Sequence, residues 1–146
     1  MIPRKVLFCT DFSENSEPAR KTAMDYTKAF NAELIVVHVI DGLTGLPADD
    51  PTFQAHVSEI VQHMKDQADA RLEQISKDCA DVLKAVKTYS TTGSPAQEIV
   101  HLANEESVDL IAMGTHGWTG IRHILLGSVA EKVLRTAKCP VLVVRS

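Results

Sequence analysis

Four short runs of apolar, largely β-branched residues limit the folds that this chain can adopt. The runs are continuous rather than alternating, which is typical of strands that are covered on both faces. Such strands belong to parallel sheets that lie between two layers of helices. The runs occupy residues 6–9, 34–40, 110–113 and 141–144, and a weaker run at 85–89 is a candidate fifth strand.

The segments between these runs carry helical patterns. The longest segment has apolar residues three and four positions apart, a spacing that places them on one face of a helix. These residues are Phe53, Val57, Ile60, Val61, Met64, Ala68, Leu72, Ile75 and Cys79. We therefore expect one long amphipathic helix between the second and third strands.

Three other helices are marked by their first turns. Pro18 fits the first turn of a helix, and Ser94 with Gln97 and Ser128 with Glu131 have the spacing of capping boxes. Strands and helices then alternate along the whole chain, and right-handed crossovers join consecutive parallel strands. The sequence predicts a single doubly wound α/β domain over residues 1–146, with helices on both faces of a five-stranded parallel sheet.

Composition and charge exclude several classes of protein. The length of 146 residues suits one domain, and 45% hydrophobic with 23% charged residues disfavours a disordered chain. A net charge of −4 argues against a non-specific nucleic-acid binder, which needs a basic face. No apolar run approaches the roughly 20 residues that cross a membrane, and the first residues do not resemble a signal peptide, so we expect a cytoplasmic protein without a membrane partner. The scattered Cys9, Cys79 and Cys139 predict neither a metal site nor a disulfide.

Two segments between the second and third strands are unusual in composition. Residues 42–51 are rich in glycine and proline, which favours a loop over the carboxyl edge of the sheet. Residues 49–82 contain eight acidic and three basic side chains. The solvated face of the long helix explains this excess, and a docking surface for a basic protein is the alternative.

One glycine pattern carries the strongest functional signal. Gly114, Thr115, His116 and Gly117 follow the fourth predicted strand, and Gly127 with Ser128 opens the next helix. Glycines let a backbone approach a phosphate closely, and the N-terminus of a helix attracts anions. The spacing matches neither a P-loop nor a dinucleotide fingerprint. From the residues alone, a phosphate site and a pair of ordinary turns both remain open.

The pattern G-x2-G-x9-G-[S/T], formed by Gly114, Gly117, Gly127 and Ser128, resembles the nucleotide-binding motif of the universal stress protein family. Three further segments are similar to that family in the same order along the chain. They are VLFCTDFS from residue 6, VHVID from residue 37 and KCPVLVV from residue 138. The resemblance spans nearly the whole chain.

The resemblance implies a strand order of 3-2-1-4-5, a homodimer through the last strand and ATP binding. Carried over by position, Val39 would meet adenine through its backbone, and Asp11 would lie near the ribose and phosphates. Met113 and Gly114 would line the ribose side. The phosphates would lie among Gly117, Gly127, Ser128 and Val129, and Mg²⁺ would be held mainly through the phosphates. A side chain at position 127 is expected to disturb these phosphate contacts more than the fold.

Some of these positions have other interpretations or depart from the family. Asp11 has the alternative role of capping the first helix, and Ser128 is expected to cap a helix in either case. His116 stands where the family often has arginine, and Trp118 where a basic residue is common, with Arg122 as the candidate replacement. No nucleophile or orienting carboxylate is identifiable beside His116, so we assign it to the binding site and predict no catalytic residue.

The function predicted at this point is that of an ATP-binding protein that responds to nucleotide and regulates a stress response through an unidentified protein partner. A slow ATP hydrolase or phosphotransferase is one alternative. Hydrolysis needs an oriented water and usually a metal and a positive group on the γ-phosphate, and the sequence offers Asp11 and His116 or Arg122 but no pair of metal-binding carboxylates near the motif. A dimeric interaction module without bound nucleotide is the other.

Overall fold

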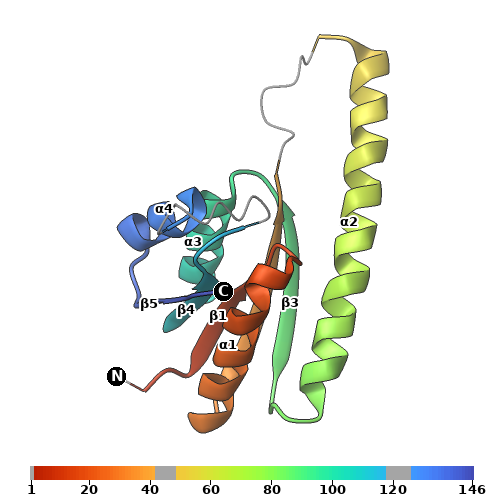
Figure 1. Ribbon diagram of the computed structural model, residues 1–146. Coiled ribbons are helices and arrows are strands. Elements are labelled where there is room, and N and C mark those ends of the chain that lie inside the picture. The colour runs from red at the N-terminus through yellow and green to blue at the C-terminus, as the bar shows by residue number, and fades with distance from the viewer. Residues whose placement is uncertain (1, 42–48, 118–125) are drawn as a thin grey trace.

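The structure, a computed structural model, describes residues 2–41, 49–117 and 126–146. Strands and helices alternate along the chain (Figure 1). The strands are β1 (Lys5–Cys9), β2 (Glu33–Ile40), β3 (Val86–Thr92), β4 (Leu110–Gly114) and β5 (Val141–Val144). The helices are a 3-10 turn η1 (Glu14–Ser16), then α1 (Glu17–Ala29), α2 (Pro51–Ala80), α3 (Pro95–Glu105) and α4 (Ser128–Thr136). The predicted loop at 42–51 lies mostly outside the described residues, with only Asp49, Asp50 and Pro51 described.

The five strands form one parallel sheet in the order β3-β2-β1-β4-β5, which confirms the predicted fold class. β1 lies at the centre, where Phe8 pairs with Val36 of β2 and Ala112 of β4. The chain moves outward from β1 to β3 and then returns to place β4 on the other side of β1. This reversal opens a crevice at the carboxyl ends of the strands.

Helices cover both faces of the sheet, which explains why the strand sequences are continuously apolar. On one face, α1 and α2 pack against Val6, Phe8 and Leu34. On the other face, α3 and α4 pack against Leu7 and Ile35. Neighbouring residues of β1 therefore point into hydrophobic cores on opposite faces of the sheet, and the side chains on both faces are buried.

The ends of two elements differ from the sequence-based expectation. The third strand runs to Thr92, three residues beyond the expected end, because it pairs along its whole length with β2. α4 begins at Ser128 with Gly127 as its N-cap, so the prediction that Ser128 caps this helix is wrong. Ser94 does precede α3 as expected, although its side chain makes no capping hydrogen bond within the described residues.

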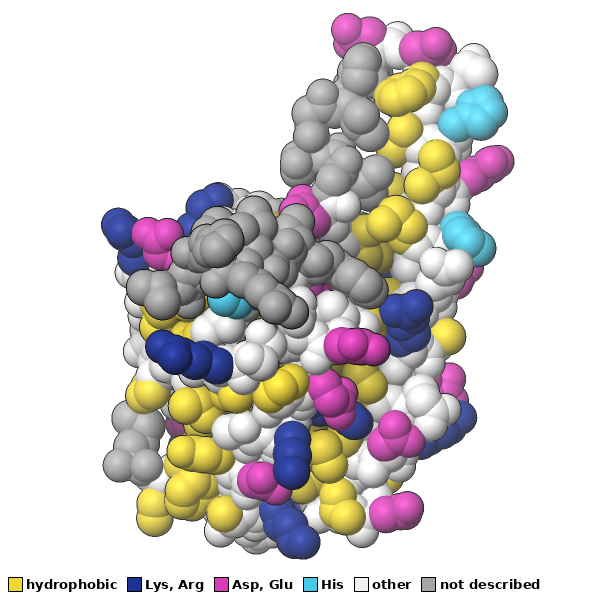
Figure 2. Space-filling view, in the orientation of Figure 1, with side chains coloured by type: hydrophobic (Ala, Val, Ile, Leu, Met, Phe, Trp, Pro, Cys, Tyr) yellow, Lys and Arg dark blue, Asp and Glu magenta, His cyan; other side chains and the backbone are white. Residues whose placement is uncertain are grey.

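α2 forms a single helix of 30 residues, and only its second half packs on the sheet. Figure 1 shows its first half extending past the carboxyl edge of the strands. Its buried residues, Ala68, Leu72 and Cys79, all lie in the second half. In the first half, Ile60 is 55% exposed and Phe53 is 37% exposed. Figure 2 shows hydrophobic side chains along the upper part of this helix.

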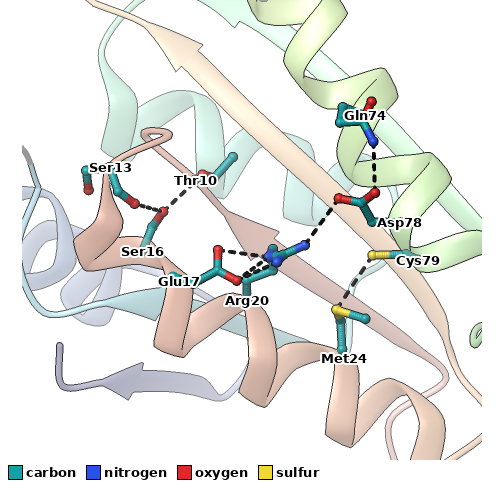
Figure 3. Close-up of polar contacts among 9 residues, drawn as sticks. All are labelled: Thr10, Ser13, Ser16, Glu17, Arg20, Met24, Gln74, Asp78 and Cys79. Atoms are coloured by element: carbon teal, nitrogen blue, oxygen red, sulfur yellow. Dashed lines mark hydrogen bonds and ion pairs between the residues drawn. The ribbon is translucent and has the colours of Figure 1, made fainter.

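Polar contacts hold the second half of α2 on α1 (Figure 3). Arg20 of α1 donates from Nε to Glu17 at 2.9 Å and reaches Asp78 of α2, with 4.0 Å between the guanidinium and the carboxylate. Beside this pair, the Cys79 thiol lies 3.6 Å from the Met24 sulfur. The main packing of α2 is on β3 and β2, and these contacts join it to α1 as well.

Within the described residues, no helix is both long enough and apolar enough to cross a membrane.

Candidate functional site

A cavity of about 720 Å³ lies at the carboxyl edge of the sheet. We call it the carboxyl-edge cavity. It is lined by the ends of β1, β2 and β4 and by the first turns of α3 and α4, and one stretch of α2 closes its side. All nine residues predicted for the site line it: Asp11, Val39, Met113, Gly114, His116, Gly117, Gly127, Ser128 and Val129.

Asp11 follows β1 at the centre of this edge. Its Oδ1 accepts hydrogen bonds from the backbone N–H of Ser13 at 2.9 Å and from the Ser13 hydroxyl at 2.6 Å. These bonds shape the turn that leads into η1, so Asp11 does not cap α1, whose N-cap is Ser16. The second oxygen, Oδ2, points toward the glycine loop, where it lies 3.1 Å from the place that a Cβ at Gly117 would occupy.

At two of the motif glycines, a carbonyl oxygen of another backbone segment lies close to the position that a Cβ would occupy. A Cβ on Gly127 would lie 2.9 Å from the Thr115 carbonyl oxygen, which also accepts the Gly127 N–H at 2.6 Å. A Cβ on Gly114 would lie 3.1 Å from the Asn15 carbonyl oxygen. The φ of −70° at Gly127 is open to any residue, so its need for glycine comes from close approach rather than from backbone angles.

The start of α4 forms one wall of the cavity. Gly127, Ser128, Val129 and Ala130 all line the cavity there. No side chain among the described residues caps this helix at its N-cap position. The first N–H groups of an α-helix and its positive dipole end attract an anion, so this wall suits a phosphate or carboxylate.

Val39 and Met113 belong to the apolar floor of the cavity. Both pack on the core between the sheet and helices α3 and α4, and Met113 is buried. His116 is half-buried and lines the cavity beside Gly117. Trp118 and Arg122, the other two positions where the chain departs from the family pattern, lie outside the described residues.

Sequence reasoning missed the opposite wall, which α2 supplies. Met64, Gln67, Ala68 and Arg71 line the cavity from this helix. Their spacing of three and four residues places them on one helical face, and this is the only signal that the sequence offers. Nothing in that spacing shows that the face meets the carboxyl edge.

A stack of three side chains completes this wall. The rings of Phe12 and His38 are stacked with 4.3 Å between their centroids, and the Arg71 guanidinium carbon lies 5.3 Å from the Phe12 centroid. Phe12 adopts a φ of 63°, a left-handed backbone that is costly for an aromatic residue. Its N–H donates to the Thr10 hydroxyl at 3.0 Å, and this bond helps to hold the strained turn.

His38 is fixed in this stack as a neutral ring. Its Nδ1 lies 2.9 Å from the Thr10 carbonyl oxygen, which makes Nδ1 the donor. Burial lowers the pKa of His38, and the hydrogen bond to Thr10 only partly opposes this effect. Since the ordinary pKa of histidine already lies below 7, the imidazole is uncharged at neutral pH.

The cavity also includes the thiol of Cys9. Burial raises the pKa of Cys9, so the thiol stays protonated and unreactive at neutral pH. Among the described residues, no group of three or more His, Cys, Asp and Glu side chains is arranged to hold a metal ion. The described part of the cavity therefore offers an anion-attracting wall, an apolar floor and an aromatic, cationic wall.

Comparison with known proteins identifies relatives over almost the full chain. The model of the universal stress protein family matches residues 3–145. Universal stress protein MJ0577 of Methanocaldococcus jannaschii is 36% identical over 153 residues, which cover 97% of this chain and 94% of that protein. Universal stress protein MJ0531 of the same organism is 39% identical over 144 residues, with coverage of 97% and 82%.

Solved structures agree with the sequence relatives. The structure of MJ0577 is similar to this chain with a TM-score of 0.88, covering 100% of this chain and 98% of that one at 36% identity. A crystal structure of a universal stress protein in complex with cAMP is similar with a TM-score of 0.71 and 25% identity, covering 99% and 98%.

Proposed function

Because this chain belongs to the universal stress protein family, we propose that it binds ATP in the carboxyl-edge cavity and acts as a nucleotide-responsive regulatory protein. In this proposal the protein works in the cytoplasm as one domain over residues 1–146 and pairs with a second copy through β5. An unidentified protein partner reads the nucleotide state.

The observation that carries the proposal is that the nine residues implied by the family resemblance all line one cavity. They come from β2, β4 and the start of α4 and from the loops that follow β1 and β4. The cavity lies where the strand order reverses, which is the usual ligand position in open parallel sheets. A relative that was solved in complex with cAMP adds support for an adenine nucleotide.

The chemistry of the walls suits the parts of ATP. In the proposed arrangement, Val39 meets the adenine and Asp11 lies near the ribose, with Met113 and Gly114 beside it. The phosphates meet Gly117 and the first turn of α4, where backbone N–H groups and the helix dipole favour negative charge. His116 lies beside the phosphates in this arrangement.

Mg²⁺ fits this site only as a companion of the phosphates. The cation usually keeps several waters and takes one or two carboxylates in addition to phosphate oxygens. Asp11 is the carboxylate nearest the glycine loop among the described residues, and no cluster of three metal-binding side chains surrounds it there. Mg²⁺ would therefore screen the phosphates, and the chain's own residues would bind and orient the nucleotide.

Isothermal titration with ATP tests the proposal. We expect about one ATP per chain, and an increase in melting temperature with added ATP. The matched variants are Ser128→Glu and Ser128→Gln, because Ser128 is exposed at the first position of α4. A carboxylate there favours the helix but repels phosphates. Ser128→Glu should therefore bind ATP at least about tenfold more weakly than Ser128→Gln, although its melting temperature without ATP should be no lower.

Three outcomes of this experiment differ in meaning. An unchanged melting temperature and no heat of binding at millimolar ATP would contradict the proposal and leave an interaction module without nucleotide. Equal affinity of the two Ser128 variants would contradict the phosphate position. Release of phosphate over many turnovers would make the protein a slow hydrolase rather than a regulator that holds ATP.

A further inference from the structure

Arg71 has no acidic partner within the described ranges, where no ion pair includes its guanidinium. This separates it from Arg20, which contacts Glu17 and Asp78. Its recorded contact is the ring of Phe12, and the exposed Arg71 side chain lines the carboxyl-edge cavity. A guanidinium that is stacked but not paired remains available for a ligand.

The surroundings of Arg71 suit the face of a flat ring. Met64 and Ala68 precede it on the same helical face and present carbon surface to the cavity. His38, which stacks on Phe12, precedes Val39 in β2, and both residues line the carboxyl-edge cavity. The carbon surface of these residues suits a purine ring, and the tripolyphosphate titration below separates this role from pairing of the guanidinium with a phosphate.

We propose that Arg71 is a base-binding residue, and that its guanidinium extends the stack of His38 and Phe12 onto the nucleobase. The guanidinium is planar, and its carbon lies 5.3 Å from the centroid of the Phe12 ring. In this proposal the base stacks on the guanidinium from the side of the cavity. This inference rests on the proposed function and deepens it, because it makes the cavity selective for nucleotides over phosphate compounds that lack a base.

The strained turn at Phe12 gives this stack a fixed position. Phe12 has a left-handed backbone, and its ring contacts both His38 and Arg71. Arg71 is thereby ordered before a ligand arrives, so less side-chain entropy is lost on binding. Phe12 is a positioning residue in this scheme, and Arg71 is the residue that touches the base.

Calorimetric titration of three Arg71 variants tests the role of the planar cation. Arg71→Ala should weaken ATP binding about fivefold, the change that corresponds to a cation–π contact of about 1 kcal/mol. Arg71→Lys keeps the charge but loses the plane and should also weaken binding, while Arg71→Gln keeps a planar group and should retain more affinity than Arg71→Ala. Lys65→Gln removes a positive charge from an exposed position of α2 that does not line the cavity, and should bind ATP like the parent.

Inorganic tripolyphosphate, which has no base, separates stacking from general attraction between charges. If Arg71 stacks on the base, Arg71→Ala binds tripolyphosphate as the parent does. Full retention of ATP affinity in Arg71→Lys, or equal losses for ATP and tripolyphosphate in Arg71→Ala, would overturn the inference while leaving ATP binding intact. Failure of the parent to bind ATP would instead contradict the proposed function.

A double-mutant cycle with Phe12→Leu measures the coupling within the stack. If Phe12 positions Arg71, the loss of ATP affinity in the double variant is smaller than the sum of the two single losses. Additive losses would contradict the positioning role of Phe12. Thermal melts of all variants provide the fraction of folded protein for each titration.

Discussion

Gly127 and Gly117 share a motif but have different surroundings. The position of Gly127 is set by the Thr115 backbone, which neither a side-chain rotation nor a bound ligand can move out of the way. Gly117 is exposed, and the nearest atom to an added Cβ is the carboxylate oxygen of Asp11, 3.1 Å away at the end of a side chain. A side chain at position 127 is therefore expected to disturb the fold as well as the proposed phosphate contacts, and Gly117 is the better test of phosphate binding.

Alanine substitutions at these two glycines should affect different properties, the stability of the fold at Gly127 and the affinity for ATP at Gly117. Gly127→Ala forces two backbone segments apart and should lower the free energy of unfolding by about 1–3 kcal/mol, the usual cost of overpacking. Gly117→Ala should unfold like the parent but bind ATP about tenfold more weakly, because its Cβ enters the space between Asp11 and the phosphates. Urea unfolding and ATP calorimetry on both variants check this.

A Gly117→Ala variant with the parent's ATP affinity would remove this glycine from the phosphate site. A Gly127→Ala variant as stable as the parent would show that the α4 start can shift away from Thr115 without cost.

Helix α2 has one apolar face, which is buried against the sheet in its second half and largely exposed in its first half. Periodicity alone could not separate its halves, because the spacing of three and four residues is the same from Phe53 to Cys79. The difference comes from length. Thirty helical residues span about 45 Å, whereas the seven residues of the adjacent β3 span about 23 Å. The first half therefore has no sheet to cover, and the apolar face there stays largely exposed.

Truncating one residue in each half should show this contrast. Leu72 is 1% exposed, so Leu72→Ala should lower the free energy of unfolding by about 2–5 kcal/mol through lost burial and a cavity. Ile60 is 55% exposed, so Ile60→Ala should change it by no more than about 0.5 kcal/mol. Denaturant titrations measure both values, and a large loss in Ile60→Ala would reveal a contact that covers the first half of α2.

β5 forms one edge of the sheet, and its residues are only partly buried. The Ile111 N–H donates to the Pro140 carbonyl, and the Thr115 N–H donates to the Val144 carbonyl. With this register, the alternation of a parallel ladder points the N–H groups of Val141 and Val143 away from β4. An edge with outward donors is a template for strand addition, which supports the proposed homodimer.

Proline at position 143 should separate the proposed dimer. Val143→Pro removes one outward donor while leaving the inward bonds to β4 in place, and proline is tolerated on edge strands for this reason. We expect light scattering to show a dimer for the parent and a monomer for the variant at the same micromolar concentration. Because the Val143 side chain also packs on the core, circular dichroism serves as the control that the variant remains folded. A monomeric parent would contradict dimerisation through β5.

Local sequence patterns predicted the strands and helices of this protein, and the family resemblance supplied the residues of one side of its cavity. Continuous apolar runs predict strands buried on both faces, and the motif residues follow those strands directly, so each of the nine lies within a few residues of a recognisable element. The strand order itself came from the family resemblance, because short apolar runs do not specify their neighbours. The end of β3, the start of α4 and the reason for glycine at 127 depend on contacts with other segments.

The second side of the cavity was decided by tertiary packing. Phe12, His38 and Arg71 come from three elements, and nothing local to any of them indicates the other two. Their meeting requires β2 to pair with β1 and α2 to lie across β2 and β3. The same packing decides which half of the apolar face of α2 is buried. The sequence shows which side chains share one face of a helix. Which segment packs against that face depends on the position of the helix in the folded protein.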